Sequence, residues 1–150
     1  MTIEIKPAPP DLASEYIRLR GSTRENAISQ ERLKALGITA ETWANDIRTE
    51  ELQGVVALSD QQLVGYCFGS SSSGEIVVLA VRPAFEGQDI GQRLLTSVVE
   101  LLNSLGHVRL FLGCSSDPTA RSYGFYRHLG WRSTGTVDER GDEILELVQK

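Results

Sequence analysis

The sequence is poor in the residues that support metal binding and disulfide bonding. It contains two cysteines and two histidines among 150 residues, and no pair of them has the short spacing of zinc ligands. Cys67 and Cys114 each stand in an apolar stretch typical of buried thiols. We expect a reduced protein without a bound metal, although one disulfide between these two cysteines stays open.

Long apolar runs and an excess of basic residues are also absent. Residues 76–81 form an apolar run, but a membrane-spanning helix needs about 20 such residues. Residues 1–6 carry charge where a signal peptide would be apolar. The chain has 15 basic and 20 acidic residues, a net charge of -5, which suits an amine partner better than nucleic acid. We expect a cytoplasmic protein with neither a membrane nor a nucleic-acid partner.

Several motifs of nucleotide-dependent and hydrolytic enzymes are missing. The sequence has neither the G-x-x-x-x-G-K-[ST] motif of a P-loop nor the G-x-G-x-x-G motif of a dinucleotide site, so nucleotide hydrolysis and hydride transfer are unsupported. The segment Gly113-Cys-Ser-Ser is not a G-x-S-x-G elbow. A thiol hydrolase that uses Cys114 is a distant alternative, because no spacing arranges it with His128.

The apolar pattern that is present predicts one mixed α/β (α+β) domain over residues 1–150. Its length and 41% hydrophobic content suit a single core. Asp11 and Thr39 are candidate helix N-caps. The predicted order is a strand at 2–6, helices at 12–20, around 33–36 and at 40–47, a hairpin of 55–58 and 63–68, a strand at 75–81, a long helix at 90–105, a strand at 108–114, a short helix at 119–129, and strands at 131–138 and 143–148.

The most informative segment runs from the strand at 75–81 into the long helix at 90–105. The strand is nearly all apolar, which predicts a central strand covered on both faces, and its unit with the next strand must be parallel. Residues 82–91 form the turn that enters the helix. The free N–H groups of a first helical turn can bind a phosphate, and Gly87 and Gly91 would let it approach closely. The alternative is that these glycines only shape the connection.

Two matched segments make the sequence resemble the GNAT superfamily of N-acetyltransferases. Residues 78–83 and 86–95 are similar to that family's Val-x-Pro strand end and its [QR]-x-x-G-x-[GA] acyl-CoA loop. Residues 122–131, Ser-Tyr-Gly-Phe-Tyr-Arg-His-Leu-Gly-Trp, are similar to its Phe-Tyr-x-x-x-Gly-Phe segment. The resemblance covers most of the chain, and both segments occur in the family's order and spacing.

This resemblance implies a fold, a reaction and a coenzyme site. The fold is a largely antiparallel twisted sheet with a parallel β-α-β unit at its centre and flanking helices, often found as a homodimer. The reaction is transfer of an acetyl group from acetyl-CoA to an amine by direct attack in a ternary complex. The coenzyme-binding residues it implies are Leu79, Ala80, Val81, Glu86, Gly87, Gln88, Asp89, Ile90, Gly91, Gln92, Thr119 and Ser122.

The same resemblance implies two catalytic residues. Tyr126 matches the family tyrosine that acts as general acid near the coenzyme sulfur, and its phenol is protonated at neutral pH; the alternative is an ordinary core tyrosine. Glu75 begins a strand similar to that of the histone-acetylating branch, where a glutamate is the general base. Desolvation in a cleft would raise its pKa toward that role. Equally, Glu75 could be a solvated carboxylate at a strand end.

Two acidic residues depart from the family's loop pattern. Glu86 stands where the family has Gln or Arg, and Asp89 where it has the middle glycine. Asp tolerates left-handed backbone angles, so we expect the shape of the loop to survive. We also expect like-charge repulsion to weaken coenzyme binding unless both carboxylates point into solvent. A non-catalytic acyl-CoA-binding module of the same fold is therefore the alternative function.

Acceptor recognition in this fold usually comes from the early helices and late strands, here residues 18–45 and 131–140. The polar run 20–26 either lines an acceptor pocket or forms an exposed loop, and the second reading is favoured. His107 and His128 are expected in surface or packing roles.

Overall fold

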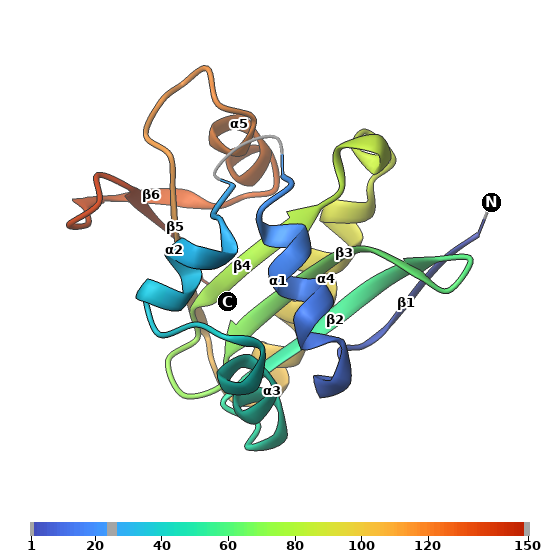
Figure 1. Cartoon of the computed structure of the whole chain (residues 1–150). Coiled ribbons are helices and arrows are strands. Elements are labelled where there is room, and N and C mark those ends of the chain that lie inside the picture. The colour runs from blue at the N-terminus through green and yellow to red at the C-terminus, as the bar shows by residue number, and fades with distance from the viewer. Residues whose placement is uncertain (1, 24–26, 149–150) are drawn as a thin grey trace.

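The protein is described here by a computed structural model that covers residues 2–23 and 27–148 (Figure 1). Its elements are, in order, β1 (Ile3–Pro7), the 3-10 turn η1 (Pro10–Leu12), α1 (Ala13–Arg20), α2 (Gln30–Ala35), α3 (Ala40–Arg48), β2 (Leu52–Ser59), β3 (Gln62–Ser70), β4 (Ile76–Val81), the 3-10 turn η2 (Pro83–Phe85), α4 (Ile90–Ser104), β5 (Arg109–Cys114), α5 (Arg121–His128), β6 (Arg132–Val137) and β7 (Glu143–Val148). The predicted order of elements and the mixed α/β class are confirmed.

The strands form two antiparallel sheets that meet through β4 and β5. The larger sheet has the order β1-β2-β3-β4, and the smaller one has the order β5-β7-β6. A parallel bridge between Glu75 and Phe111 joins them, and the N–H of Phe111 donates to the carbonyl of Gly74 at 3.3 Å. The predicted parallel β-α-β unit is thus present, but β4 and β5 share this bridge and not a long ladder.

The prediction that this strand is covered on both faces is wrong for part of β4. Val77 is 46% exposed, and Val78 and Leu79 are only half-buried. The cause is the divergence of β4 from β5 beyond the Glu75 bridge, which removes the neighbour that a central strand would have.

A β-bulge in β4 changes which side chains face each layer. Phe68 pairs with Val78, whereas Gly69 pairs with Ile76, so Val77 is an extra residue on the β4 side. Ile76 therefore packs into the core under α4, and Val78 packs on the opposite face. A bulge at this point also increases the local twist of the strand.

Helices cover both faces of the larger sheet, with α4 behind it and α1 to α3 in front of it in Figure 1. Leu94, Leu95, Val98 and Leu102 form the buried stripe of α4 that the sequence predicts. The front layer holds an aromatic cluster of Tyr16, Trp43, Tyr66 and Phe68, whose ring centroids are 5.2 to 5.7 Å apart. Apolar burial and edge-to-face ring contacts stabilise this layer.

Local helix signals had mixed outcomes. Thr39 caps α3, as predicted, and the structure adds a capping box with Thr42. Asp11 does not cap α1, because it lies inside η1 and the residue before α1 is Leu12. The short helix predicted from residue 119 begins at Arg121.

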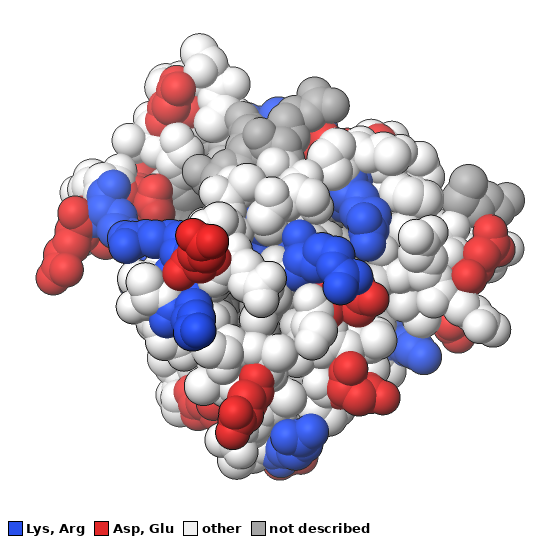
Figure 2. All heavy atoms as spheres, in the orientation of Figure 1, with Lys and Arg blue, Asp and Glu red and all other residues white. Residues whose placement is uncertain are grey.

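Within the described residues, no helix combines the length and apolarity needed to cross a membrane. On the face in Figure 2, basic and acidic side chains are interspersed.

Candidate functional site

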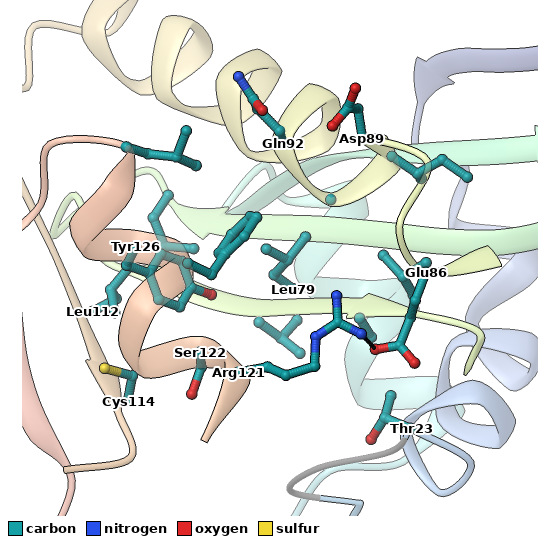
Figure 3. A pocket seen from close by; sticks show the side chains of 18 of the residues that line it. Thr23, Leu79, Glu86, Asp89, Gln92, Leu112, Cys114, Arg121, Ser122 and Tyr126 are labelled. Atoms are coloured by element: carbon teal, nitrogen blue, oxygen red, sulfur yellow. Dashed lines mark hydrogen bonds and ion pairs between the residues drawn. The ribbon is translucent and has the colours of Figure 1, made fainter. Parts of the chain in front are cut away.

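A cleft of about 630 Å³ lies where β4 and β5 diverge (Figure 3). Its walls come from β4, the turn before α4, the end of β5 and the helix α5. Most of the residues implied by the family resemblance line it: Leu79, Ala80, Val81, Glu86, Gly87, Asp89, Ile90, Gly91, Gln92, Ser122 and Tyr126. One edge of β4 pairs with β3, so the backbone groups of its other edge face this opening.

The turn between β4 and α4 is anchored to β3 and contains a glycine with a positive φ. The N–H of Arg82 donates to the carbonyl of Val64 at 2.8 Å, and its Nε donates to the carbonyl of Leu63 at 2.6 Å, which anchors the turn to β3. Gly87 has a φ of 80° with open space around its Cα, a conformation that favours glycine. The first residues of α4, Ile90, Gly91 and Gln92, also line the cleft.

Asp89 takes the left-handed conformation that its residue type tolerates. Its φ and ψ are 62° and 12°, and it precedes α4 as the N-cap residue. Its side chain makes no capping hydrogen bond to the helix and is exposed. These angles agree with the expectation that Asp tolerates left-handed backbone angles at this position. The carboxylate nevertheless stands at the rim of the cleft, among the residues that line it.

Glu86 forms an ion pair with a residue that the sequence patterns did not single out. Arg121, the first residue of α5, donates from Nη1 to Oε2 of Glu86 at 2.7 Å. The Glu86 side chain is 19% exposed and that of Arg121 is 52% exposed. Both line the cleft, so the carboxylate points to a cation and not into bulk solvent. The two residues are 35 positions apart, and no local pattern could have paired them.

Tyr126 lies at the inner end of the cleft with its hydroxyl directed into the space beside Leu79 (Figure 3). Its ring packs edge-on against Phe125 and Trp131, at centroid distances of 5.1 and 6.1 Å. Burial raises the pKa of the Tyr126 phenol above its ordinary value, and the nearby Cys67 and Cys114 add to the rise. The phenol therefore keeps its proton at neutral pH.

The helix α5 brings two further features to its wall of the cleft. The Oγ of Ser122 is buried and has no hydrogen-bond partner among the residues that the structure describes. Arg127 forms an ion pair with Glu143 of β7, and its guanidinium lies 3.6 Å from the centre of the Tyr123 ring. These contacts fix α5 against the smaller sheet and so hold Ser122 and Tyr126 toward β4.

Glu75 lies at the closed end of the divergence and is not among the lining residues. Burial raises the pKa of its carboxyl group, the positive charge of Arg140 opposes the rise, and Asp138 adds to it. These two residues belong to the turn between β6 and β7. Glu75 thus faces the part of the protein from which we expect acceptor recognition.

Two of the implied coenzyme residues, Gln88 and Thr119, are not among the residues that line the cleft. The N–H and hydroxyl of Thr119 both donate to Oδ1 of Asp117, at 2.9 and 2.8 Å, which forms a local turn before α5. The lining also includes residues outside the implied set, among them Arg20, Thr23, Phe85, Phe125, His128 and Arg121. Arg20 and Thr23 come from the polar run 20–26, whose residues 24–26 lie outside the described part of the chain.

The cysteines give no support to thiol chemistry. Cys67 and Cys114 are both buried and free, so the disulfide is absent. Burial is the main cause that raises the pKa of the Cys114 thiol, which disfavours the thiolate that a nucleophile needs. His128 lines the same cleft. Across residues 2–23 and 27–148, no three His, Cys, Asp or Glu side chains gather in a way that could hold a metal ion.

Comparison with known proteins extends the fold similarity over the whole chain. PaiA N-acetyltransferase from Thermoplasma acidophilum, solved with coenzyme A, is 21% identical with a TM-score of 0.82, covering 99% of both chains. YncA from Salmonella typhimurium, solved with its cofactor acetyl-CoA, is 14% identical with a TM-score of 0.79, covering 100% of this chain and 95% of that one. The ribosomal-protein-S18-alanine N-acetyltransferase from Escherichia coli is 16% identical with a TM-score of 0.71, covering 99% and 96%.

Comparison of the sequence with family models identifies the family of the chain. No curated protein sequence matches the chain. A family model described as the acetyltransferase (GNAT) family matches residues 17–131, a span that includes β4, the turn before α4 and all of α5. The chain therefore belongs to the acetyltransferase (GNAT) family.

Proposed function

We propose that this protein transfers an acetyl group from acetyl-CoA to an amine, by direct attack within a complex of enzyme, coenzyme and acceptor. The observation that carries the proposal is one continuous cleft lined by the glycine-containing turn, the open edge of β4 and the Tyr126 phenol. Family membership and the coenzymes solved with PaiA and YncA support the choice of acyl donor.

The residues of the cleft fit a coenzyme of this kind. A volume of about 630 Å³, a glycine at a φ of 80° and a buried hydroxyl of Ser122 without a described partner are features that a phosphate-bearing, extended ligand would use. First-turn N–H groups between Gly87 and Gln92 would hold the pyrophosphate. Backbone groups of Leu79 and Val81 would hold the pantetheine arm and polarise the thioester carbonyl.

Acetyl-CoA would supply the acetyl group as an activated thioester. The chain must then remove a proton from the acceptor ammonium, stabilise negative charge on the carbonyl oxygen and donate a proton to the leaving sulfur. Glu75 would accept the first proton, directly or through water. Tyr126 would donate the last one from its hydroxyl, and it would regain that proton from solvent. The attack joins the acceptor nitrogen to the acetyl carbon as the carbon–sulfur bond breaks.

Two measurements test the proposal in order. Acetyl-CoA should raise the midpoint of thermal unfolding, and the rise should continue with the logarithm of its concentration, because a ligand that binds only the folded state stabilises it by mass action. Release of free thiol should then follow on addition of one or more amines from a panel of amino acids, polyamines and peptides. No thermal shift at millimolar acetyl-CoA would overturn coenzyme binding. A shift without thiol release on any amine would favour the non-catalytic binding module, which the acidic residues Glu86 and Asp89 suggested.

A further inference from the structure

The contact between Glu86 and Arg121 joins two walls of the cleft. Glu86 belongs to the turn before α4, and Arg121 opens α5. Their side chains meet at 2.7 Å, and both line the same opening as Gly87 and Gly91. Figure 3 shows the guanidinium between α5 and Glu86, with one terminal nitrogen at the carboxylate and the other directed into the pocket.

The charges of the turn call for a cation at this place. Glu86 and Asp89 are both acidic and both line the cleft, whereas a coenzyme pyrophosphate carries two further negative charges. Four charges of one sign at short range call for positive groups besides the backbone N–H groups. Among the described residues, two arginines line the cleft, Arg20 and Arg121, and Arg121 of α5 already pairs with Glu86, one of the four charges.

The geometry of a guanidinium allows it to serve two anions at once. Its five N–H donors lie in one plane and leave in different directions, so one edge can hold a carboxylate while another holds a phosphate. The Nη1 of Arg121 serves Glu86. The neighbouring Ser122 Oγ, buried and without a described partner, adds a donor on the same wall.

We propose that Arg121 is a ligand of the coenzyme pyrophosphate, and that Glu86 positions its guanidinium for this contact. The inference rests on the proposed use of acetyl-CoA. It also accounts for the departure of Glu86 from the family's loop pattern: a residue that would repel the phosphates instead anchors the cation that binds them, from the opposite wall of the cleft.

The test must separate a phosphate ligand from a cation that only neutralises Glu86. Calorimetric titration with coenzyme A would be run on the wild type, Arg121→Gln, Glu86→Gln and the double variant. A lost charge-assisted hydrogen bond predicts about tenfold weaker binding for Arg121→Gln. The double variant should bind more weakly than Glu86→Gln, but by less than tenfold, because Glu86 no longer positions the guanidinium. An equal tenfold loss in both backgrounds would overturn the positioning role of Glu86. Equal affinities of Glu86→Gln and the double variant would overturn the inference, because Arg121 would then matter only through Glu86.

A matched control tests whether the loss of any arginine charge weakens the binding of coenzyme A. Arg109 pairs with Glu146 at 2.7 Å with 49% and 33% exposed side chains, and it does not line the cleft. Arg109→Gln removes the same charge and should leave the affinity for coenzyme A within about twofold. Unfolding of each variant without ligand checks that the fold is intact.

Dephospho-coenzyme A keeps the pyrophosphate and should show the same tenfold loss in Arg121→Gln, whereas pantetheine has no phosphate and should show none. A loss limited to coenzyme A would place the contact at the 3′-phosphate and overturn the assignment, and a loss with pantetheine would mean a distorted cleft. Failure of the wild type to bind coenzyme A would instead overturn the proposed function.

Discussion

The backbones of Glu75 and Phe111 form a parallel bridge at the point where the two sheets meet. Beyond this bridge β4 pairs with β3 alone, and the cleft opens between β4 and β5. Glu75 therefore lies at the closed end of the site, near the turn that carries Asp138 and Arg140. Its position gives two of the following predictions.

Glu75→Gln should lower kcat/KM by about 100-fold or more if Glu75 is the general base. The base must be ionised, so the wild-type rate should rise with pH through the pKa of Glu75, which burial raises above its usual range. The variant should lose that ascending limb. Rates measured from pH 4.5 to 9 with a subsaturating amine, which report kcat/KM, check this. A variant whose pH profile overlaps that of the wild type would assign the base to water or another residue.

The same substitution should change stability in a pH-dependent way. Because burial raises the pKa of Glu75 in the folded protein, the folded state favours the protonated form. The contribution of Glu75 to the free energy of unfolding is fully present below the unfolded pKa of about 4.3. This contribution is lost as pH rises through the folded pKa. Gln stays neutral throughout, so Glu75→Gln should unfold at a higher temperature than the wild type at pH 7.5 and at the same temperature at pH 4. A lower midpoint at pH 7.5 would contradict this.

Tyr126→Phe should reduce kcat by about 100-fold while the affinity for coenzyme A stays within about twofold. Phenylalanine keeps the ring contacts with Phe125 and Trp131 and removes only the hydroxyl. Thiol release and calorimetric titration measure the two effects separately. Full activity in this variant would remove Tyr126 from the role of general acid. Tyr123→Phe, on the same helix but outside the lining of the cleft, is the control.

Asp89→Asn should bind coenzyme A about two- to fivefold more tightly than the wild type, as expected for one exposed charge. Asparagine tolerates the left-handed φ of 62°, so the variant removes charge without changing the turn. The gain should shrink in 0.5 M salt, where exposed charges are screened. Asp46→Asn on α3, away from the cleft, should have no effect. An unchanged affinity would show that the Asp89 carboxylate does not act on the phosphates.

Two glycine-to-alanine changes should shift stability in opposite directions. A Cβ on Gly54 would lie 2.2 Å from the carbonyl oxygen of Cys67 and 2.6 Å from Cδ1 of Phe68, so Gly54→Ala should cost about 2–3 kcal/mol of unfolding free energy through overpacking. Gly124 lies within α5 with open space around it, and Gly124→Ala should add up to about 1 kcal/mol of helix propensity. Denaturant unfolding of both variants measures the difference, and a stabilised Gly54→Ala would refute the close packing of β2 on β3.

Local sequence determined the features whose cause lies within a few residues. Thr39 faces Thr42 one helical turn away, so its capping box follows from spacing alone. The buried stripe of α4 follows from the helical period of its apolar residues. The angles of Asp89 follow from the tolerance of its residue type for left-handed backbone. The turn that lines the cleft could be located because it lies between an apolar strand and an amphipathic helix, which are both local patterns.

Only the tertiary structure decided the features that depend on distant parts of the chain. The pairing of Glu86 with Arg121 joins residues 35 positions apart, and the exposure of Val77 depends on a bulge in its register with β3. Gln88 and Thr119 match the family spacing, yet they do not line the cleft. A period or a cap is set by backbone geometry over about four residues, whereas charge neutralisation and strand divergence arise when separate elements pack together. The sequence alone thus determined where the turn is, and the packing of α5 against it decided which charges face the cleft.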